Sequence, residues 1–508
     1  MSHQPVVLAN GSSIPLSSIP VREFMDLRSM ILERVAGGSH LASFFAFPCG
    51  DEMRLAAVLT APEEGGLAVG VAKVGDAFPS ITPECREAHM FEREMAEQWN
   101  IVPRGHPWLK PVRFHAPYAG KRDERLSEWF GGGKGPAVMD FFQVEGEEVH
   151  EVAVGPVHAG VIEPGHFRFQ CHGEEVMHLE ISLGFQHRGV EKSLWGGPTP
   201  RTRHLMETLA GDTTCGHAMA YAMNVEALAG LEVMPAAHRA RAIALELERI
   251  ANHVGDLGAL AGDVGFLPTA SYCGRLRGDI LNLTAALCGN RFGRGMIVPG
   301  GVGHAINGAL AGNVREKLSV AIRDIRGAVK LIFEAPSVMT RFEGTGAVGR
   351  HVADYLGMVG PAARAGGLET DVRLDLPHGM YREDLFPLEL GTNGDVMDRA
   401  LQRRKEIDTS ARLIDGWLVE DCAAETADPY AIHKLAADSF SVSLSEGWRG
   451  QICHVALTGP DGRFIAYKIA DPSFHNWTGL AMALRGQQIS DFPLCNKSFN
   501  LSYCGHDL

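Results

Sequence analysis

Residues 205–262 read LMETLAGDTTCGHAMAYAMNVEALAGLEVMPAAHRARAIALELERIANHVGDLGALAG, a run rich in alanine and leucine with the periodicity of buried helix. Pro235 interrupts the run, and proline is favoured in the first turn of a helix, so the pattern predicts two helices. In the second helix Glu246, Arg249 and His253 fall on one face at helical spacing. We expect that face to look into a site or an interface. A lone histidine in such a helix is more often a hydrogen-bonded core residue than a ligand, so its role depends on the other motifs.

Length and charge narrow the possible classes of protein. The chain has 508 residues, of which 45% are hydrophobic, so it can form two or three domains with sizeable cores. Its formal net charge of −14 argues against a nucleic-acid binder, because phosphate contacts need a basic surface.

Targeting signals and cysteine frameworks are not apparent. No run of apolar residues is long enough to span a membrane, and the first residues lack a secretion signal, so we expect a cytoplasmic protein. The ten cysteines include no CxxC pair, and their scattered spacing predicts mostly buried free thiols.

The pattern of elements predicts two domains. Helical runs such as REFMDLRSMILERV alternate with strand-like pieces such as HLASFFAFP and DEMRLAAVLTA, which indicates an α+β domain over residues 1–116. A charged and then glycine-rich stretch over residues 117–145 is typical of a linker. Residues 146–508 are predicted to form a mainly α-helical domain with small β elements.

The motifs of the second part carry a family resemblance. ELERIANHVGDLG, VGPVHAGVIEPGHFRF and the HRGVEK turn resemble signatures of the large subunit of nickel-iron hydrogenases and of its homologue, the 49 kDa subunit of respiratory complex I. In hydrogenases the glutamate that matches Glu163 takes part in proton transfer. The segment Glu163-Pro164-Gly165 is also compatible with a simple turn.

The N-terminal part resembles a second protein of complex I. MFEREMAEQWNIVPRGHPWLKPVRF is similar to the closing signature of the 30 kDa subunit, which is fused in front of the large subunit in many energy-converting hydrogenases. The match rests on the following residues: Glu92, Arg93, Glu94, Gly105, His106 and Pro107.

The resemblance places the hydrogenase metal ligands at four positions of this chain. Hydrogenases hold nickel and iron with two CxxC pairs, because soft thiolates suit those metals. Registering the family motifs on this sequence puts the four ligands at Ala210, Thr213, Ser502 and Gly505. We therefore predict that the chain builds no nickel-iron centre of its own and needs none of the C-terminal processing of hydrogenases.

Complex I uses the corresponding cavity for a quinone, held by a histidine and by a tyrosine beside the first lost cysteine. His158 or His166 can supply the histidine here, which predicts a quinone-type site. The tyrosine position registers with Gly211, so the full quinone site is not reproduced.

Further motifs support the scaffold. SEGWRGQICHVAL resembles the hydrogenase strand whose arginine projects over the metals, and Arg449 holds that position. Together with Glu163, His166 and His217, Arg449 is predicted to line a proton relay or acceptor cavity. GDVMDRALQRRKEIDTSARLI resembles a family helix that faces the small subunit, and its alternating charges predict a solvated face.

The resemblance implies the large core subunit of a complex I-like, formate hydrogenlyase-like oxidoreductase that couples electron transfer to a membrane module. Because the chain has no cluster motif, electrons are expected from the iron-sulfur cluster of a complex I-type small subunit. Antiporter-like membrane subunits are the other expected partners, which would hold this subunit on the inner face of the cell membrane. At the level of the whole complex, the resemblance also implies quinone and NAD binding.

Two other functions remain open. A purely structural protein could transmit conformational change to the membrane partners without binding substrate. A true hydrogenase would have to use the displaced thiols of Cys215, Cys495 or Cys504, which form no CxxC chelate.

Overall fold

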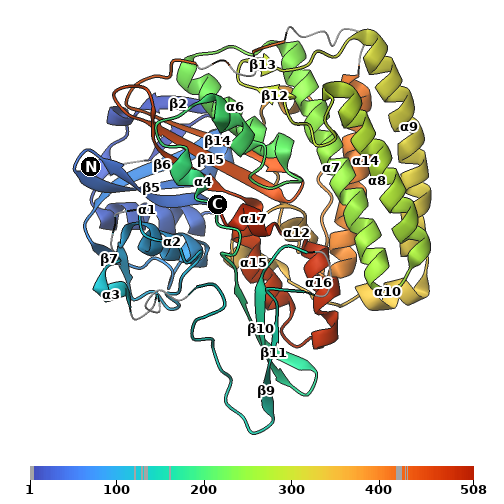
Figure 1. Ribbon diagram of the computed structural model, residues 1–508, viewed down its shortest axis with the longest axis horizontal. Helices are drawn as coiled ribbons and strands as arrows, with labels where there is room; N and C mark the ends of the chain where they lie inside the picture. The colour runs from blue at the N-terminus through green and yellow to red at the C-terminus, as the bar shows by residue number, and fades with distance from the viewer. Residues whose placement is uncertain are drawn as a thin grey trace.

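The computed structural model describes residues 5–118, 120, 122–127, 130, 135–158, 162–418, 426–428, 431 and 433–508. A sheet-rich N-terminal region is followed by a mainly helical region with a few strands, which confirms the predicted fold class (Figure 1). Parts of the predicted linker, including residues 131–134, lie outside the described residues.

The N-terminal region contains a five-stranded sheet in the order β1-β6-β5-β4, with β3 paired to β6. The predicted helix and strands are confirmed by α1, β4 and β5, and their apolar residues build the core. The elements of this region are β1 (Val6–Leu8), β3 (Val21–Arg22), α1 (Phe24–Ala36), β4 (Leu41–Cys49), β5 (Glu52–Ala61), β6 (Gly66–Val74), β7 (Ala77–Pro79), α2 (His89–Trp99), β8 (Val102–Arg104) and α3 (Glu124–Ser127).

Helix α2 docks the N-terminal region onto the rest of the chain through buried charges. Glu94 on α2 forms ion pairs with Arg113 and with Lys468, and Lys468 also contacts Glu191 at 2.9 Å. A buried charge is tolerated only when it is paired, so these contacts specify how the two regions meet.

The helical region is built on the two helices predicted from residues 205–262. Proline opens the second of them, as the sequence predicts, because its missing N–H is not needed in the first turn. Figure 1 shows long helices packed side by side beside the central sheet. The helices of this region are α4 (Val190–Ser193), α5 (Pro200–Met206), α6 (Thr214–Ala229), α7 (Pro235–Asp263), α8 (Leu267–Cys288), α9 (Gly308–Lys330), α10 (Pro336–Phe342), α11 (Arg350–Tyr355), α12 (Gly360–Ala365), α13 (Val372–Asp375) and α14 (Val396–Trp417).

A four-stranded sheet in the order β16-β15-β14-β2 lies between the two regions. Its strands are β2 (Ser12–Pro15), β14 (Ser439–Gly447), β15 (Gly450–Thr458) and β16 (Phe464–Ala470). β2 comes from the start of the chain and pairs with β14 in register Phe440 to Ile14. Apolar residues of this sheet share one core with the N-terminal sheet.

A three-stranded sheet projects from the body of the molecule (Figure 1). It consists of β9 (Val149–Val154), β10 (His166–His172) and β11 (Glu175–Ser182). The remaining short elements are β12 (Ile297–Val298), β13 (Gly301–Val302), α15 (Pro472–Ala483), α16 (Phe492–Phe499) and α17 (Tyr503–His506).

The described cysteines are free thiols and most are buried, which confirms that prediction; Cys422 lies outside the described residues. Across the described ranges, no helix has the length and apolar composition needed to cross a membrane.

Candidate functional site

Arg449 lies in the turn between β14 and β15 and joins two segments that are far apart in the sequence. Its guanidinium donates to both carboxylate oxygens of Asp212, at 2.6 and 2.8 Å, and to the Thr213 hydroxyl at 3.2 Å. It also donates to the carbonyl of Asn500 and stacks on the Trp448 ring, with 3.9 Å from the guanidinium carbon to the ring centre. The segments expected to carry the two hydrogenase cysteine pairs therefore meet at Arg449.

The four expected ligand positions offer no thiolate, and their surroundings are filled. The Ser502 hydroxyl accepts a hydrogen bond from Gly505 N at 2.9 Å, and the Thr213 hydroxyl accepts from Arg449. A Cβ atom added at Gly505 would lie 2.7 Å from the Asp471 carboxyl carbon. The Asp471 carboxylate thus takes the space that a ligand side chain at residue 505 would need. Ala210 is buried and has no polar side-chain atom. This donor set does not fit a nickel-iron centre.

The displaced cysteines are held apart. Cys215 Sγ lies beside Gly293 and Cys495 Sγ beside Gly346, whereas Cys504 Sγ lies 3.4 Å from the Ser502 hydroxyl. Burial raises the pKa of the Cys504 thiol to about 11, which keeps it protonated at neutral pH. Within the described part of the chain, no three His, Cys, Asp or Glu side chains are grouped closely enough to hold a metal ion.

A chain of hydrogen bonds starts at Asp471 and runs into the central sheet. We call it the histidine chain: Asp471, His217 on α6, His454 on β15 and Tyr467 on β16. His217 Nε2 lies 3.1 Å from the Asp471 carboxylate and its Nδ1 lies 3.0 Å from His454 Nε2. His454 Nδ1 lies 3.0 Å from the Tyr467 hydroxyl. Because each imidazole donates through one nitrogen and accepts through the other, a tautomer change at one histidine requires a change at the other.

Electrostatics fix the charge states of two members of the histidine chain, Asp471 and His454. Burial opposes ionisation of Asp471, but the hydrogen bond and charge of His217 and the charge of Arg449 together hold its pKa below the usual range. Burial and the neighbouring His217 lower the pKa of His454 well below its usual value, so His454 is neutral at neutral pH. The histidine chain therefore contains one ionised carboxylate, Asp471, and one neutral imidazole, His454.

Glu163 lies against the C-terminal ligand segment. Its carboxylate accepts hydrogen bonds from the backbone N–H groups of Tyr503 and Cys504 at 3.3 and 3.4 Å. A Cβ atom at Gly165 would lie 2.4 Å from the Tyr503 ring, so glycine is needed for this close approach. The structure thus brings Glu163, Arg449 and His217 around the segment 502–505.

His158 and His166 form hydrogen bonds to backbone carbonyls of the β9–β10 loop, which also carries Glu163. His158 Nε2 lies 3.0 Å from the Gly165 carbonyl, and His166 Nδ1 lies 3.0 Å from the Gly155 carbonyl. Among the described residues, no hydrogen bond or ion pair joins either histidine to Arg449 or His217. Burial lowers the pKa of His166, which also accepts from Arg168. Both predicted quinone-type histidines are therefore engaged within their own loop.

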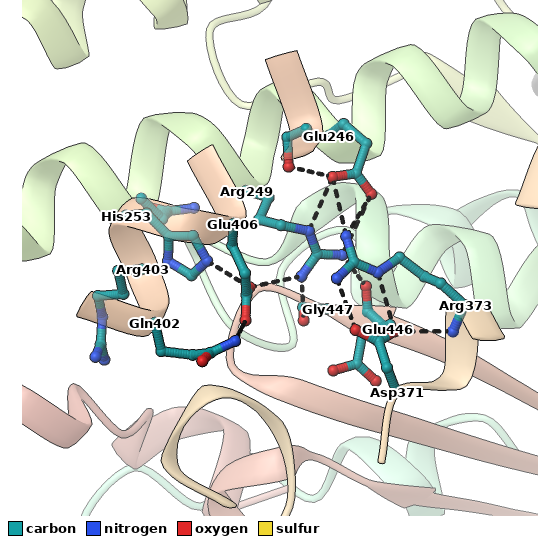
Figure 2. A network of polar contacts seen from close by, with 12 residues as sticks. Glu246, Arg249, His253, Asp371, Arg373, Gln402, Arg403, Glu406, Glu446 and Gly447 are labelled. Atoms are coloured by element: carbon teal, nitrogen blue, oxygen red, sulfur yellow. Dashed lines mark hydrogen bonds and ion pairs between the residues drawn. The ribbon is translucent and has the colours of Figure 1, made fainter. Parts of the chain in front are cut away.

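The polar face of α7 contacts the end of β14, directly before the turn that carries Arg449; Figure 2 shows Arg249 of α7 beside Glu446 and Gly447. Arg249 donates to the carbonyls of Glu446 and Gly447 at 2.6 and 2.9 Å, directly before that turn. Glu246 accepts from Arg249 Nε at 3.0 Å. His253 Nε2 lies 2.8 Å from the Glu406 carboxylate. The predicted face is thus buried and faces a network of charges.

We call that set the arginine-carboxylate network; its members are Glu246, Arg249, His253, Arg364, Asp371, Arg373, Glu406 and Glu446. Burial raises the pKa of Glu246, but Arg249, Arg373 and hydrogen bonds outweigh it and bring the pKa to about 2. Burial, together with the charge of Asp371, raises the pKa of Glu446 to about 7. Gly360, at φ +71°, lets α12 approach this turn, because a Cβ there would lie 2.1 Å from the Arg449 carbonyl oxygen.

The prediction that the charged helix α14 presents a solvated face is wrong for its inner side. Arg399, Arg403 and Glu406 are buried there. Glu406 pairs with Arg364 of α12 at 2.8 Å, and Arg403 pairs with Asp256 of α7 at 2.6 Å. Partners from other helices compensate these charges, which the helix sequence alone does not show.

Several site residues escaped sequence analysis: Asp212, Glu248, His454 and Asp471. Glu248 accepts hydrogen bonds from Cys215 N and Gly216 N at 2.6 and 3.2 Å, at the start of the helix that carries His217. Burial raises the pKa of Glu248 to about 8. Asp471 followed by Pro472 is a helix-start signal, and Asp471 does accept from Ser473 N at 2.8 Å, but that signal predicts a cap and no further role.

The chain is similar to known respiratory and hydrogenase proteins. Residues 263–434 match the family described as respiratory-chain NADH dehydrogenase, 49 Kd subunit. The chain is 30% identical over 379 residues to NADH-quinone oxidoreductase subunit 4 of Thermus thermophilus, covering 68% of this chain and 90% of that protein. It is 27% identical over 449 residues to formate hydrogenlyase subunit 5 of Escherichia coli, covering 84% of this chain and 76% of that protein. It is also 29% identical over 355 residues to the carbon monoxide-induced hydrogenase of Rhodospirillum rubrum, covering 69% of this chain and 97% of that protein.

Proposed function

Because this chain belongs to the family that contains the 49 kDa subunit of complex I and the related hydrogenase subunits, we propose that it is the large core subunit of a membrane-associated oxidoreductase complex without its own nickel-iron centre. In this proposal it receives electrons from the iron-sulfur cluster of a small partner subunit. Antiporter-like membrane subunits hold it on the inner face of the membrane.

The position of Asp471 carries the proposal. Its carboxylate occupies the space beside Gly505, where a fourth thiolate would be, and it is held there by His217 and by Ser473 N. A cysteine at residue 505 would have to displace a charged group that belongs to the histidine chain. In this proposal the Asp471 carboxylate takes the space of the fourth ligand, which argues against a simple shift of the cysteines by two residues.

A quinone is less well supported as the acceptor. Gly211 stands where complex I places its tyrosine, and His158 and His166 are both engaged by their own loop. We therefore assign no step to a quinone. What the chain's own residues can do is hold and move protons, through Glu163 and the histidine chain.

Nickel analysis tests the proposal. The full chain, purified alone and within its native complex, should contain no nickel attributable to it by elemental analysis, even after growth with added nickel. One nickel per chain would overturn the proposal. Co-purification of an iron-sulfur subunit and antiporter-like membrane subunits would support the assignment of partners, whereas isolation of a lone monomer would contradict it.

A second candidate function is conformational coupling without any substrate site. It is favoured by the way the former ligand segments bind one another: Arg449 is occupied by Asp212, Thr213 and Asn500. These hydrogen bonds of Arg449 would transmit movement between the two segments even if no group were reduced there.

Glu163→Gln separates the two functions. If Glu163 relays protons, turnover of the intact complex should fall by roughly 100-fold, because an amide of the same shape cannot accept a proton at neutral pH. The composition of the complex and its thermal stability should not change. Glu147→Gln, at an exposed carboxyl before β9, is the matched control and should keep full activity. Full activity of Glu163→Gln in a correctly assembled complex would favour conformational coupling.

A further inference from the structure

A cavity of about 380 Å³ lies between the N-terminal region and the helical region. We call it the α1–α13 cavity, because residues of both α1 and α13 line it. One wall comes from residues 35–40, 60–62 and 84–87, and the other from residues 354–376 with Glu446 and Gln451. A ligand bound there would contact both regions at once.

A buried amide in the wall lacks a partner. Gln451 is only 6% exposed, and its Nε2 forms no hydrogen bond in the structure. It stands on β15 directly opposite Glu446 of β14, and both residues line the cavity. Leaving a buried N–H donor unpaired costs free energy, and such a group calls for an acceptor that the described residues do not supply.

Two carboxyl groups that line the same cavity form no ion pair among the described residues, although Arg86 also lines it. Asp375, at the end of α13, accepts a hydrogen bond from Asp371 N at 2.8 Å, but no Lys, Arg or His side chain forms an ion pair with it among the described residues. Glu446, by contrast, is paired with Arg364 at 2.8 Å. Burial raises the pKa of Asp375 to about 6, so it remains an anion at neutral pH. Glu369 adds a further carboxyl without an ion pair in the described chain.

The rest of the lining is mixed, because polar side chains such as His40, Thr60 and Arg86 stand among apolar ones. Val35, Leu368 and Leu376 line the cavity between the polar groups. Pockets of this size with apolar walls and a few convergent polar groups are the usual sites for small ligands. An unpaired anion selects a cation, and an unpaired N–H donor selects a hydrogen-bond acceptor.

We propose that the α1–α13 cavity binds a small organic cation, with its ammonium or guanidinium group against Asp375 and a carbonyl or hydroxyl acceptor on Gln451 Nε2. A short aliphatic segment joins the two groups and packs on Val35, Leu368 and Leu376. Bound in this way, the ligand links the N-terminal region to the region that carries Arg449. The inference is independent of the proposed function.

Binding of a defined probe tests the proposal on the full-length chain. 4-Aminobutanamide carries both an ammonium and a carbonyl group, whereas butylamine carries only the first and butanamide only the second. Calorimetric titration at neutral pH should give saturable binding of 4-aminobutanamide at least about 10-fold tighter than of either single-group compound, because two polar contacts are made at once. Absence of saturable binding of 4-aminobutanamide would overturn the proposal.

Two variants locate the site. Asp375→Asn removes the anion, and Gln451→Leu removes the unpaired donor without leaving a buried polar group. Each variant should bind 4-aminobutanamide at least about 10-fold more weakly. Ser445→Ala is the matched control, since the Ser445 hydroxyl is also buried and unpaired but does not line the cavity. Unchanged affinity in both test variants would refute the assignment.

Hydrogen exchange of the unmodified chain provides a measurement that does not depend on variants. The probe should slow exchange in residues 35–40 and in residues 368–376 together, because these segments form the two walls. Protection confined to other segments would place the probe elsewhere and overturn the proposal.

Discussion

The arginine-carboxylate network and the histidine chain are both buried, and they differ in the kind of group they contain. The first is dense in full charges of both signs, such as Arg364 with Glu406 and Glu446. The second has one carboxylate, and its other members are imidazoles and a phenol. Opposed charges fix geometry, whereas imidazoles can exchange protons without leaving their positions. We therefore expect the first network to support the Trp448–Arg449 turn, and proton handling by the second stays a proposal.

The largest expected effect comes from breaking the arginine-carboxylate network. Arg364→Met leaves the carboxylates of Glu406 and Glu446 without their main cation, and removal of one partner of a buried ion pair costs about 3 to 5 kcal/mol. Denaturant unfolding of the full chain measures the loss. The exposed pair Arg326–Asp408 provides the control, and Arg326→Met should cost less than about 1 kcal/mol. Equal losses in the two variants would contradict the assigned role of the network.

A matched pair of tyrosines compares the two networks directly. Tyr381 donates its hydroxyl proton to the Glu246 carboxylate at 2.5 Å, whereas Tyr467 bonds to the neutral His454 at 3.0 Å. Hydrogen bonds to charged groups contribute about 1.5 to 3 kcal/mol and neutral ones about 1 kcal/mol. Tyr381→Phe should therefore lower the free energy of unfolding more than Tyr467→Phe does. The opposite order, measured by denaturant unfolding, would mean that the hydrogen bond of Tyr467 in the histidine chain stabilises the fold more than the hydrogen bond of Tyr381 does.

Glycine replacement tests whether Asp471 fills the former ligand space. Gly505→Ala places a methyl group against the Asp471 carboxylate, and overpacking of this kind costs about 1 to 3 kcal/mol. Gly211→Ala is the control, because a Cβ atom at residue 211 meets nothing within 4 Å. Thermal unfolding should separate the two variants. A neutral Gly505→Ala would show that the carboxylate moves freely, which would weaken the argument against a ligand there.

The smallest effect concerns pH. The pKa of Glu248 is raised to about 8 in the folded chain, above its unfolded value, so its contribution to stability is complete below about pH 4.5 and is lost as pH rises to about 8. The slope cannot exceed about 1.4 kcal/mol per pH unit for one group. Glu248→Gln should remove that slope. The free energy of unfolding of the variant should therefore increase relative to that of the natural chain as pH rises. Parallel profiles from denaturant unfolding at several pH values would contradict the assignment; the exposed Glu147→Gln serves as the control.

Sequence periodicity predicted the helices of the site but only part of its contacts. The shared face of Glu246, Arg249 and His253 follows from helical spacing, and the structure confirms that it is buried. Its partners Arg373 and Glu406 come from segments more than a hundred residues away, and spacing within one helix cannot name them. For the same reason the inner side of α14 was wrongly predicted to face solvent.

The position of Asp471 beside Gly505 and His217 could not be predicted from the sequence. In the sequence it is a helix cap before a proline, which is a common pattern. Only the fold places its carboxylate next to Gly505 and His217 at the same time. The family motifs could identify the expected ligand positions but not the carboxylate that lies beside residue 505. The roles of Glu163, His158 and His166 stay predictions.

The pairing of β2 with β14 has a consequence for synthesis on the ribosome. Residues 12–15 leave the exit tunnel early, but their partner strand at residues 439–442 is made only after more than four hundred further residues. At typical elongation rates of about 5 to 20 residues per second, β2 waits for tens of seconds as an unpaired strand edge. Unpaired edges attract other strands, so the nascent N-terminal region needs protection during this interval. The sheet that carries Arg449 is therefore completed late, when both of its distant segments have emerged.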